Sequence, residues 1–183
     1  MKIILCRHGE SINNVKKNLA RTNDNSRLTF KGEKQAERLA LLLKKHKIEK
    51  IFFLPKRRCA ATAKIICKNL RLPGQAMAEF RERDWGSWGR QTWLKVSSRL
   101  DTFSTNKRYK FTPPQGESWQ DMEKRLLKGL NKILKQKRDV AAIITHRGCL
   151  RAILPVLKKV DRSRHCQYDV DLGSAVVIRL NEK

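Results

Sequence analysis

Histidine, arginine and glycine stand together at two places in the chain, as Arg7-His8-Gly9 and as His146-Arg147-Gly148. A neutral imidazole can accept a phosphoryl group, and an unperturbed pKa of about 6.5 leaves most histidine neutral at pH 7. Guanidinium groups bind phosphoryl oxygens through paired hydrogen bonds, and a carboxylic acid can protonate the leaving oxygen. The two motifs therefore indicate phosphoryl transfer as the chemistry to test.

The spacing of the cysteines and histidines argues against cysteine-based catalysis and against a metal site. Cysteine-dependent phosphatases carry an arginine six positions after the cysteine, and none of the five cysteines has one there. The cysteines form no C-x-x-C pair and the four histidines show no H-E-x-x-H spacing, which argues against a disulfide framework and a metal site. A P-loop, a G-x-G-x-x-G loop and a G-x-S-x-G elbow are also absent. We therefore expect no metal and no cofactor.

Short apolar runs rich in β-branched residues predict strands that are buried on both faces. These runs are Lys2–Leu5, Ile51–Leu54, Val140–Thr145 and Ala175–Leu180. Apolar residues at helical spacing lie between them and predict helices, which are centred on Ala36–Leu43, Trp119–Ile133 and Leu150–Leu157. Ser118 is the expected N-cap of the second helix, and Pro155 is expected to kink or shorten the third.

This alternation predicts an α/β fold, a mostly parallel sheet covered by helices on both faces. Ligands of such sheets bind beyond the carboxyl ends of the strands. Three of the predicted strands are followed there by basic or imidazole groups, at residues 7–9, 56–58 and 146–148. The fold class therefore places the reactive motifs at one edge of the sheet.

The length of 183 residues fits one domain spanning residues 1–183. No apolar run approaches the roughly 20 residues that cross a bilayer, and no secretory segment follows Met1, so we expect a cytoplasmic protein with no membrane partner. The net charge of +25 favours anionic partners, either nucleic acid or a small phosphorylated substrate. A solvated lysine-rich surface without a specific partner is the plain alternative. The sequence carries no prediction of the oligomeric state.

Six motifs in order along the chain resemble those of the histidine phosphatase superfamily, which includes the cofactor-dependent phosphoglycerate mutases. Residues 7–14 match its R-H-G-x-[T/S]-x-x-N signature. The others are Leu28-Thr29-Phe30-Lys31-Gly32, Pro55-Lys56-Arg57-Arg58, Arg81-Glu82-Arg83-Asp84-Trp85-Gly86, Gly116-Glu117-Ser118 and Thr145-His146. The resemblance implies a phosphoglycerate mutase-like fold, a three-layer αβα sandwich.

The resemblance also implies roles for individual residues. His8 would be the nucleophile, and Glu82 would be the proton donor, with Glu10 and Glu117 as the other candidate carboxylates. Arg7, Arg58, His146 and Asn14 would bind the phosphoryl oxygens, with Gly9 letting the backbone approach the phosphate and Ser11 at the edge of the pocket. Arg147 stands where the family usually has glycine, which would either strain the backbone or add a substrate-binding cation. Leu54 replaces a usual serine.

The segment from about residue 84 to 115 is the least regular part of the sequence and is expected to cover the active site. The 63 residues from 83 to 145 are fewer than the mutases carry, which favours water entry and a phosphomonoesterase over a phosphoglycerate mutase. From Arg83 to Gly116, with Arg83 included, there are seven basic residues against two acidic ones, which favours a multiply charged substrate. An inactive member that binds nucleic acid is less favoured, because the basic and aromatic residues are scattered along the sequence.

Overall fold

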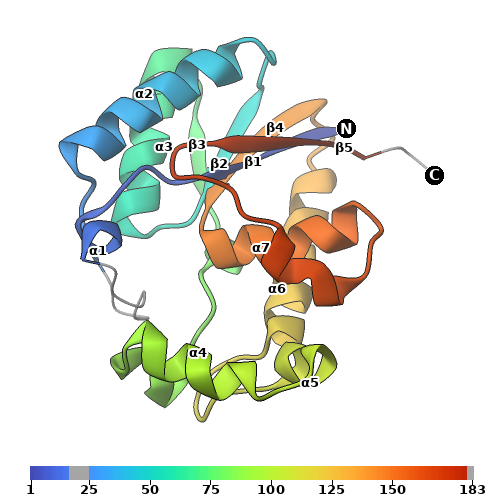
Figure 1. Ribbon diagram of the computed structural model, residues 1–183. Coiled ribbons are helices and arrows are strands. Elements are labelled where there is room, and N and C mark those ends of the chain that lie inside the picture. The colour runs from blue at the N-terminus through green and yellow to red at the C-terminus, as the bar shows by residue number, and fades with distance from the viewer. Residues whose placement is uncertain (17–24, 181–183) are drawn as a thin grey trace.

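The computed structural model describes residues 1–16 and 25–180 (Figure 1). A five-stranded sheet lies at its centre, with strand order β3-β2-β4-β1-β5. The strands are β1 (Lys2–Arg7), β2 (Lys50–Phe53), β3 (Gly74–Ala76), β4 (Val140–Thr145) and β5 (Ala175–Arg179). Strand β5 runs antiparallel to β1, and the other three pairs are parallel. The predicted mostly parallel sheet is confirmed.

Helices cover both faces of this sheet and give three layers (Figure 1). The longer helices are α2 (Phe30–Lys44), α3 (Arg57–Leu70), α6 (Trp119–Leu134) and α7 (Arg147–Leu157). Buried residues of α2 and α3 cluster with Ile4 of β1, whereas those of α6 and α7 cluster with Ile3 and Leu5. Alternate residues of a strand point to opposite faces, so a continuously apolar β1 fills both cores. The three-layer αβα architecture is confirmed.

Local signals in the sequence explain where two of these helices begin. Thr29 caps α2, its hydroxyl accepting the N–H of Gly32 at 3.0 Å. Ser118 caps α6 as predicted: its hydroxyl accepts the Asp121 N–H at 3.0 Å, and the Asp121 carboxylate accepts the Ser118 N–H at 3.2 Å. Pro155 lies inside α7, which runs on to Leu157, so the proline does not end that helix.

Two parts of the fold differ from the expectations. Strand β3 was not predicted, because Gly74–Ala76 is a three-residue edge strand without an apolar pattern. The segment expected to be irregular contains the 3-10 helix η2 (Gly86–Arg90) and two short helices, α4 (Trp93–Asp101) and α5 (Thr105–Lys110). We call residues 84–115 the cover segment. Trp85, Val96 and Leu100 form its own small apolar cluster.

The remaining short elements are α1 (Ile12–Val15) and the 3-10 helices η1 (Ala78–Phe80) and η3 (Arg162–Gln167). Figure 1 shows α4 and α5 near the start of α6, apart from the sheet. None of the helices in residues 1–16 and 25–180 combines the length and the apolar character that crossing a membrane requires. Cys6, Cys59 and Cys149 are buried and free, and Cys67 is free and partly exposed; the side chain of Cys166 lies outside the description.

Candidate active site

The two motif histidines come together because their strands are parallel neighbours. In the pairing of β1 with β4, Arg7 lies opposite Thr145, so the next residues, His8 and His146, leave the sheet side by side. The His8 N–H also donates to the Thr145 carbonyl at 3.1 Å. The two rings are both buried and meet edge to face, with centroids 5.0 Å apart and planes at 72°. The predicted convergence of these side chains at the carboxyl edge is what the structure shows.

The hydrogen bonds of His8 define which ring nitrogen carries the proton. Its Nδ1 lies 2.6 Å from the carbonyl oxygen of Gly9, which can only accept, so Nδ1 carries the hydrogen. Its Nε2 then has the lone pair, and it accepts the Nε–H of Arg58 at 3.3 Å. Arg58 is buried in the first turn of α3. His8 therefore presents a neutral nucleophilic nitrogen to a guanidinium that could hold a phosphoryl oxygen.

His146 is held neutral by its surroundings. Burial lowers the pKa of the ring well below its usual value, and the nearby cations Arg58, Lys56 and Arg7 lower it further. The thiol of Cys59 lies 3.5 Å from Nε2 of His146. Burial raises the pKa of this thiol to about 12, so it stays protonated and can donate to the ring. Sequence reasoning missed this contact, because the two residues are 87 positions apart and their spacing gives no signal.

Glu82 is fixed at the N-terminus of α7. One of its carboxylate oxygens accepts the Gly148 N–H at 3.2 Å, and the other accepts the Arg83 N–H at 2.9 Å. A Cβ atom added to Gly148 would lie 2.0 Å from that second oxygen, so only glycine leaves room for the carboxylate. Since His146 is the N-cap of α7, this arrangement brings Glu82 to the edge where His146 lies.

The two other carboxylates considered as proton donors are engaged elsewhere. Glu10 accepts the hydroxyl of Thr29 at 2.8 Å and forms an ion pair with Lys31 at 3.4 Å. Glu117 is buried and forms an ion pair with Arg125, and it also accepts the Asp84 N–H at 3.1 Å. The described hydrogen-bond partners of Glu82 are instead two backbone N–H groups, those of Arg83 and Gly148.

Arg7 and Arg147 are held in different ways. Arg7 donates through Nη1 to the carbonyl of Val170 at 2.8 Å, and its charge lies near enough to His146 to act on that ring's pKa. Arg147 lies in the helical backbone of α7, so the expected strain does not arise. Its guanidinium makes a two-pronged pair with Asp169, with Nε donating at 2.7 Å. An anionic substrate would therefore have to compete with Asp169 for the Arg147 guanidinium.

Gly9, Ser11 and Asn14 shape the loop that follows β1. A Cβ atom on Gly9 would lie 2.2 Å from the carbonyl oxygen of Gly32, so the glycine permits close packing of this loop against α2. This differs from the expected reason, a close approach of backbone to phosphate. The carbonyl oxygen of the Asn14 side chain accepts both the N–H and the hydroxyl of Ser11, each at 2.9 Å. Thr62, which the sequence did not single out, accepts the Gly9 N–H at 3.1 Å.

The other two histidines, His46 and His165, belong to none of the matched family motifs. His165 is buried, and its ring packs against Trp119 with centroids 4.8 Å apart. His46 is partly exposed between α2 and β2. In the described part of the chain, no three His, Cys, Asp or Glu side chains form a group that could hold a metal ion.

The comparisons with known proteins agree with this geometry. Residues 3–183 match the sequence model of the histidine phosphatase superfamily (branch 1). The chain belongs to this superfamily. It is 24% identical to the adenosylcobalamin/alpha-ribazole phosphatase of Escherichia coli over 187 residues, which cover 100% of this chain and 92% of that protein. The family and the phosphatase class predicted from the motifs are confirmed.

A mutase and a solved structure complete the comparison. The 2,3-bisphosphoglycerate-dependent phosphoglycerate mutase of Thermoplasma acidophilum is 51% identical, but only over 67 residues, 36% of this chain and 34% of that protein. The alpha-ribazole phosphatase of Shigella flexneri has the same fold, with a TM-score of 0.84, 23% identity, and coverage of 100% of this chain and 92% of its own. The histidine phosphatase fold is therefore shared along the whole chain.

Proposed function

We propose that this histidine phosphatase hydrolyses a small phosphorylated metabolite in two steps through a phosphohistidine on His8. In the first step, Nε2 of His8 forms a bond to phosphorus while the bond from phosphorus to the ester oxygen breaks. Glu82, as the carboxylic acid, gives its proton to that oxygen, and the alcohol leaves. Arg7, Arg58, His146 and the Asn14 side chain bind the phosphoryl oxygens as their charge redistributes.

In the second step, the Glu82 carboxylate takes a proton from water. The water oxygen bonds to phosphorus, the bond from phosphorus to Nε2 of His8 breaks, and inorganic phosphate leaves. Glu82 is protonated again and His8 is neutral again, so the cycle balances without a metal or cofactor. We leave Arg147 out of the phosphate-binding set, because Asp169 already compensates its charge.

The observation that carries this proposal is the protonation state of His8. The Gly9 carbonyl accepts from Nδ1, which leaves the lone pair on Nε2, the nitrogen that faces Arg58. A phosphoryl group bonded to Nε2 would thus have a guanidinium beside its oxygens. A merely structural histidine would have no need of a buried guanidinium at its lone pair, since burying a charge is costly.

The decisive experiment traps the intermediate and compares two histidine variants. Wild-type protein mixed with a ³²P-labelled substrate and quenched in base should carry acid-labile label on His8. The His8→Ala variant should carry none, and its turnover should fall on the order of 10³-fold or more. His46→Ala, which removes a partly exposed histidine, should keep both label and turnover. Hydrolysis by His8→Ala at the wild-type rate would exclude this mechanism.

Hydrolysis is favoured over phosphate transfer between substrates because the cover segment is short and α4 and α5 lie apart from the sheet (Figure 1). The mutase is the second candidate, and the local match to a phosphoglycerate mutase supports it. Incubation of 3-phosphoglycerate with a bisphosphate primer separates the two. We expect release of inorganic phosphate and no 2-phosphoglycerate, whereas isomerisation faster than phosphate release would establish a mutase.

The cover segment supports a substrate with more than one negative charge. Its exposed basic residues are Arg90, Lys95, Arg99, Lys107 and Lys110. Two further basic residues are engaged in other contacts: Arg108 pairs with Asp101 at 3.2 Å, and Arg83, which directly precedes the cover segment, is buried. A panel of sugar bisphosphates and monophosphates tests this: bisphosphates should have the higher kcat/KM, and equal values for both classes would contradict a multiply charged substrate.

A further inference from the structure

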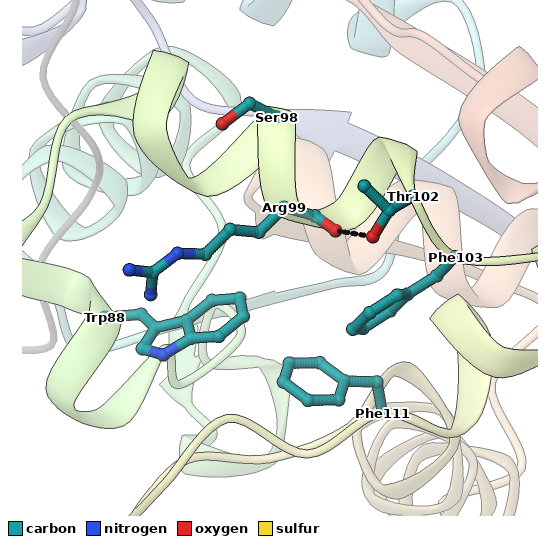
Figure 2. A pocket seen from close by; sticks show the side chains of 6 residues that line it. All are labelled: Trp88, Ser98, Arg99, Thr102, Phe103 and Phe111. Atoms are coloured by element: carbon teal, nitrogen blue, oxygen red, sulfur yellow. Dashed lines mark hydrogen bonds between the residues drawn. The ribbon is translucent and has the colours of Figure 1, made fainter.

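A pocket of about 400 Å³ opens in the cover segment, and three of the six side chains that line it are aromatic (Figure 2). It is lined by Trp88, Ser98, Arg99, Thr102, Phe103 and Phe111. The volume lies within the roughly 300–1,000 Å³ range of small-molecule sites. None of these side chains belongs to the proposed catalytic set. The pocket is therefore a second candidate for ligand binding, one that the hydrolysis reaction does not use.

Three aromatic rings lie next to one another in this pocket, and Phe103 meets Phe111 edge to face with planes at 68°. The centroids of Trp88 and Phe111 are 5.0 Å apart with planes at 38°, and those of Phe103 and Phe111 are also 5.0 Å apart. Figure 2 shows the three rings facing α4 across the pocket. All three side chains are only partly buried, although they pack on the small core of the cover segment. A planar ligand that covered them would remove apolar surface from water.

Two exposed cations stand over these rings. The guanidinium of Arg99 lies 5.4 Å from the centroid of the Trp88 ring, and Nζ of Lys107 lies 4.3 Å from that of the Phe103 ring. Within residues 1–16 and 25–180, no carboxylate forms an ion pair with Arg99 or with Lys107. An aromatic surface flanked by two such cations complements a flat ligand that carries negative charge.

The polar groups of the pocket narrow the ligand class. The hydroxyl of Ser98 donates to the carbonyl of Lys95 at 3.1 Å, and that of Thr102 donates to the carbonyl of Arg99 at 2.8 Å. Both hydroxyl hydrogens are thus taken up by α4. A sugar, which needs many hydrogen-bond partners, would find few here. A nucleobase needs mainly ring faces, because base stacking on aromatic side chains is tolerant of sequence.

We propose that this pocket binds a nucleotide unit, with the base among Trp88, Phe103 and Phe111 and the phosphate at Arg99 and Lys107. A free nucleotide and one unit of single-stranded RNA offer the same chemistry. The three aromatic residues and two basic residues of this site lie in or beside η2, α4 and α5. The site is therefore separate from the residues proposed to bind phosphate around His8. Its ligand would be one of the anionic partners that the net charge of +25 favours.

The test measures binding by calorimetry to full-length His8→Ala protein, in which hydrolysis is blocked. The probes are AMP, adenosine and ribose 5-phosphate. AMP should bind at least about tenfold more tightly than adenosine and ribose 5-phosphate, since base and phosphate both contribute. Equal affinity for AMP and ribose 5-phosphate would overturn the proposal. Binding would then depend on the phosphate alone, which is the result expected for binding at the proposed catalytic site around His8.

Pocket variants in the same background locate the binding. Arg99→Ala should weaken AMP binding about tenfold, and Thr102→Trp, which fills the pocket, should abolish it. Lys95→Ala removes an exposed cation of α4 that does not line the pocket and should change affinity less than twofold. In the catalytically competent chain, Thr102→Trp should leave turnover of p-nitrophenyl phosphate unchanged. AMP affinity unchanged by Thr102→Trp would refute the assignment.

A second experiment distinguishes a free nucleotide from single-stranded RNA as the ligand. Eight-residue oligoadenylate RNA is titrated against His8→Ala and against its Thr102→Trp derivative, with AMP as competitor. Oligoadenylate that binds over tenfold more tightly than AMP, is displaced by AMP and is sensitive to Thr102→Trp identifies single-stranded RNA. Equal affinity for both ligands identifies the free nucleotide. Oligoadenylate binding that AMP and Thr102→Trp both leave unchanged would place RNA elsewhere and count against this pocket.

Discussion

Arg58 donates a hydrogen bond from Nε to Nε2 of His8 over 3.3 Å, although the two residues are 50 positions apart in the sequence. The parallel sheet makes this possible, because β1 ends at Arg7 and α3 begins at Arg57. The first turn of a helix also offers unpaired N–H groups to an anion. The proposed nucleophile and the proposed phosphate-binding cation are thus held together by the fold before any substrate arrives.

The geometry of Arg58 predicts that a lysine cannot replace it. The guanidinium presents several donors in one plane, whereas an ammonium is a single point charge. We expect Arg58→Lys to lower kcat/KM by about 10²-fold and Arg58→Ala by about 10³-fold. Steady-state kinetics with p-nitrophenyl phosphate measures both. Arg57→Ala, the neighbouring exposed arginine, is the matched control and should change kcat/KM less than twofold. Loss of activity only in Arg57→Ala would reverse the assignment.

The contact between Gly148 and Glu82 predicts a defect in proton donation. Gly148→Ala places a Cβ atom 2.0 Å from a carboxylate oxygen of Glu82 and must displace it. A general acid matters most when the leaving group is a poor one. We expect kcat to fall at least about tenfold with an alkyl phosphate and much less with p-nitrophenyl phosphate, whose leaving group needs little protonation.

The control for that experiment is another glycine. A Cβ atom on Gly89 would meet only Trp85, at 3.8 Å, an ordinary contact. Gly89→Ala should therefore leave both rates within twofold. Glu82→Gln should reproduce the dependence on the leaving group. An equal loss for alkyl and p-nitrophenyl phosphate in both Gly148→Ala and Glu82→Gln would argue that Glu82 binds substrate and does not donate the proton.

Cys59 should matter more for stability than its neighbour in the same helix. Cys59 is fully buried against His146, so Cys59→Ala removes a packed sulfur and its contact with the ring. We expect the free energy of unfolding to drop by about 1–2 kcal/mol, by analogy with other truncations in cores. Cys67→Ala, at a partly exposed cysteine of α3, should change it by less than about 0.5 kcal/mol. Urea denaturation of both variants measures the two changes in the free energy of unfolding. Equal losses in the two variants would show that the contact of Cys59 with His146 does not contribute to stability.

Much of the fold follows from the strand pattern alone. Four of the five strands are continuous apolar runs, and the helices that alternate with strands imply parallel pairing. Because β1 and β4 are parallel neighbours, the residues that follow these two strands lie close together. Strand β3 was missed because its stability comes from pairing with β2 and not from its own residues. The helices of the cover segment were missed because each is short, and the apolar residues of α4 pack on a cluster that forms only after folding.

The residues alone predicted less of the candidate site than the resemblance to the family did. The two histidines could be inferred from their places at strand ends, whereas Glu82 follows no strand and was found through the motif it shares with the family. The contact of Cys59 with His146 and the pair of Arg147 with Asp169 could not be inferred. Each joins residues from separate segments, and packing alone decides whether their side chains meet.

The neutral state of His146 predicts a pH dependence of stability. Burial lowers its folded pKa below the unfolded value of about 6.5. Between these two values the unfolded chain binds more protons than the folded one, so the free energy of unfolding rises with pH. Burial also lowers the pKa of His165, which adds a contribution of the same sign. Stability should therefore fall as the pH is lowered from 7 to 5, by up to about 1.4 kcal/mol per pH unit for each group.

Denaturant titrations at pH 5, 6 and 7 measure this slope. His146→Gln should reduce it and His146→Gln with His165→Gln should reduce it further, since glutamine binds no proton in this range. Asp121 and Asp169, whose pKa values are lowered below about 3.8, lose their contributions only at lower pH and do not interfere. Lys64→Gln, at an exposed position of α3, serves as the control and should keep the wild-type slope. A slope between pH 5 and 7 that persists in the double variant would mean that His146 and His165 are not its source.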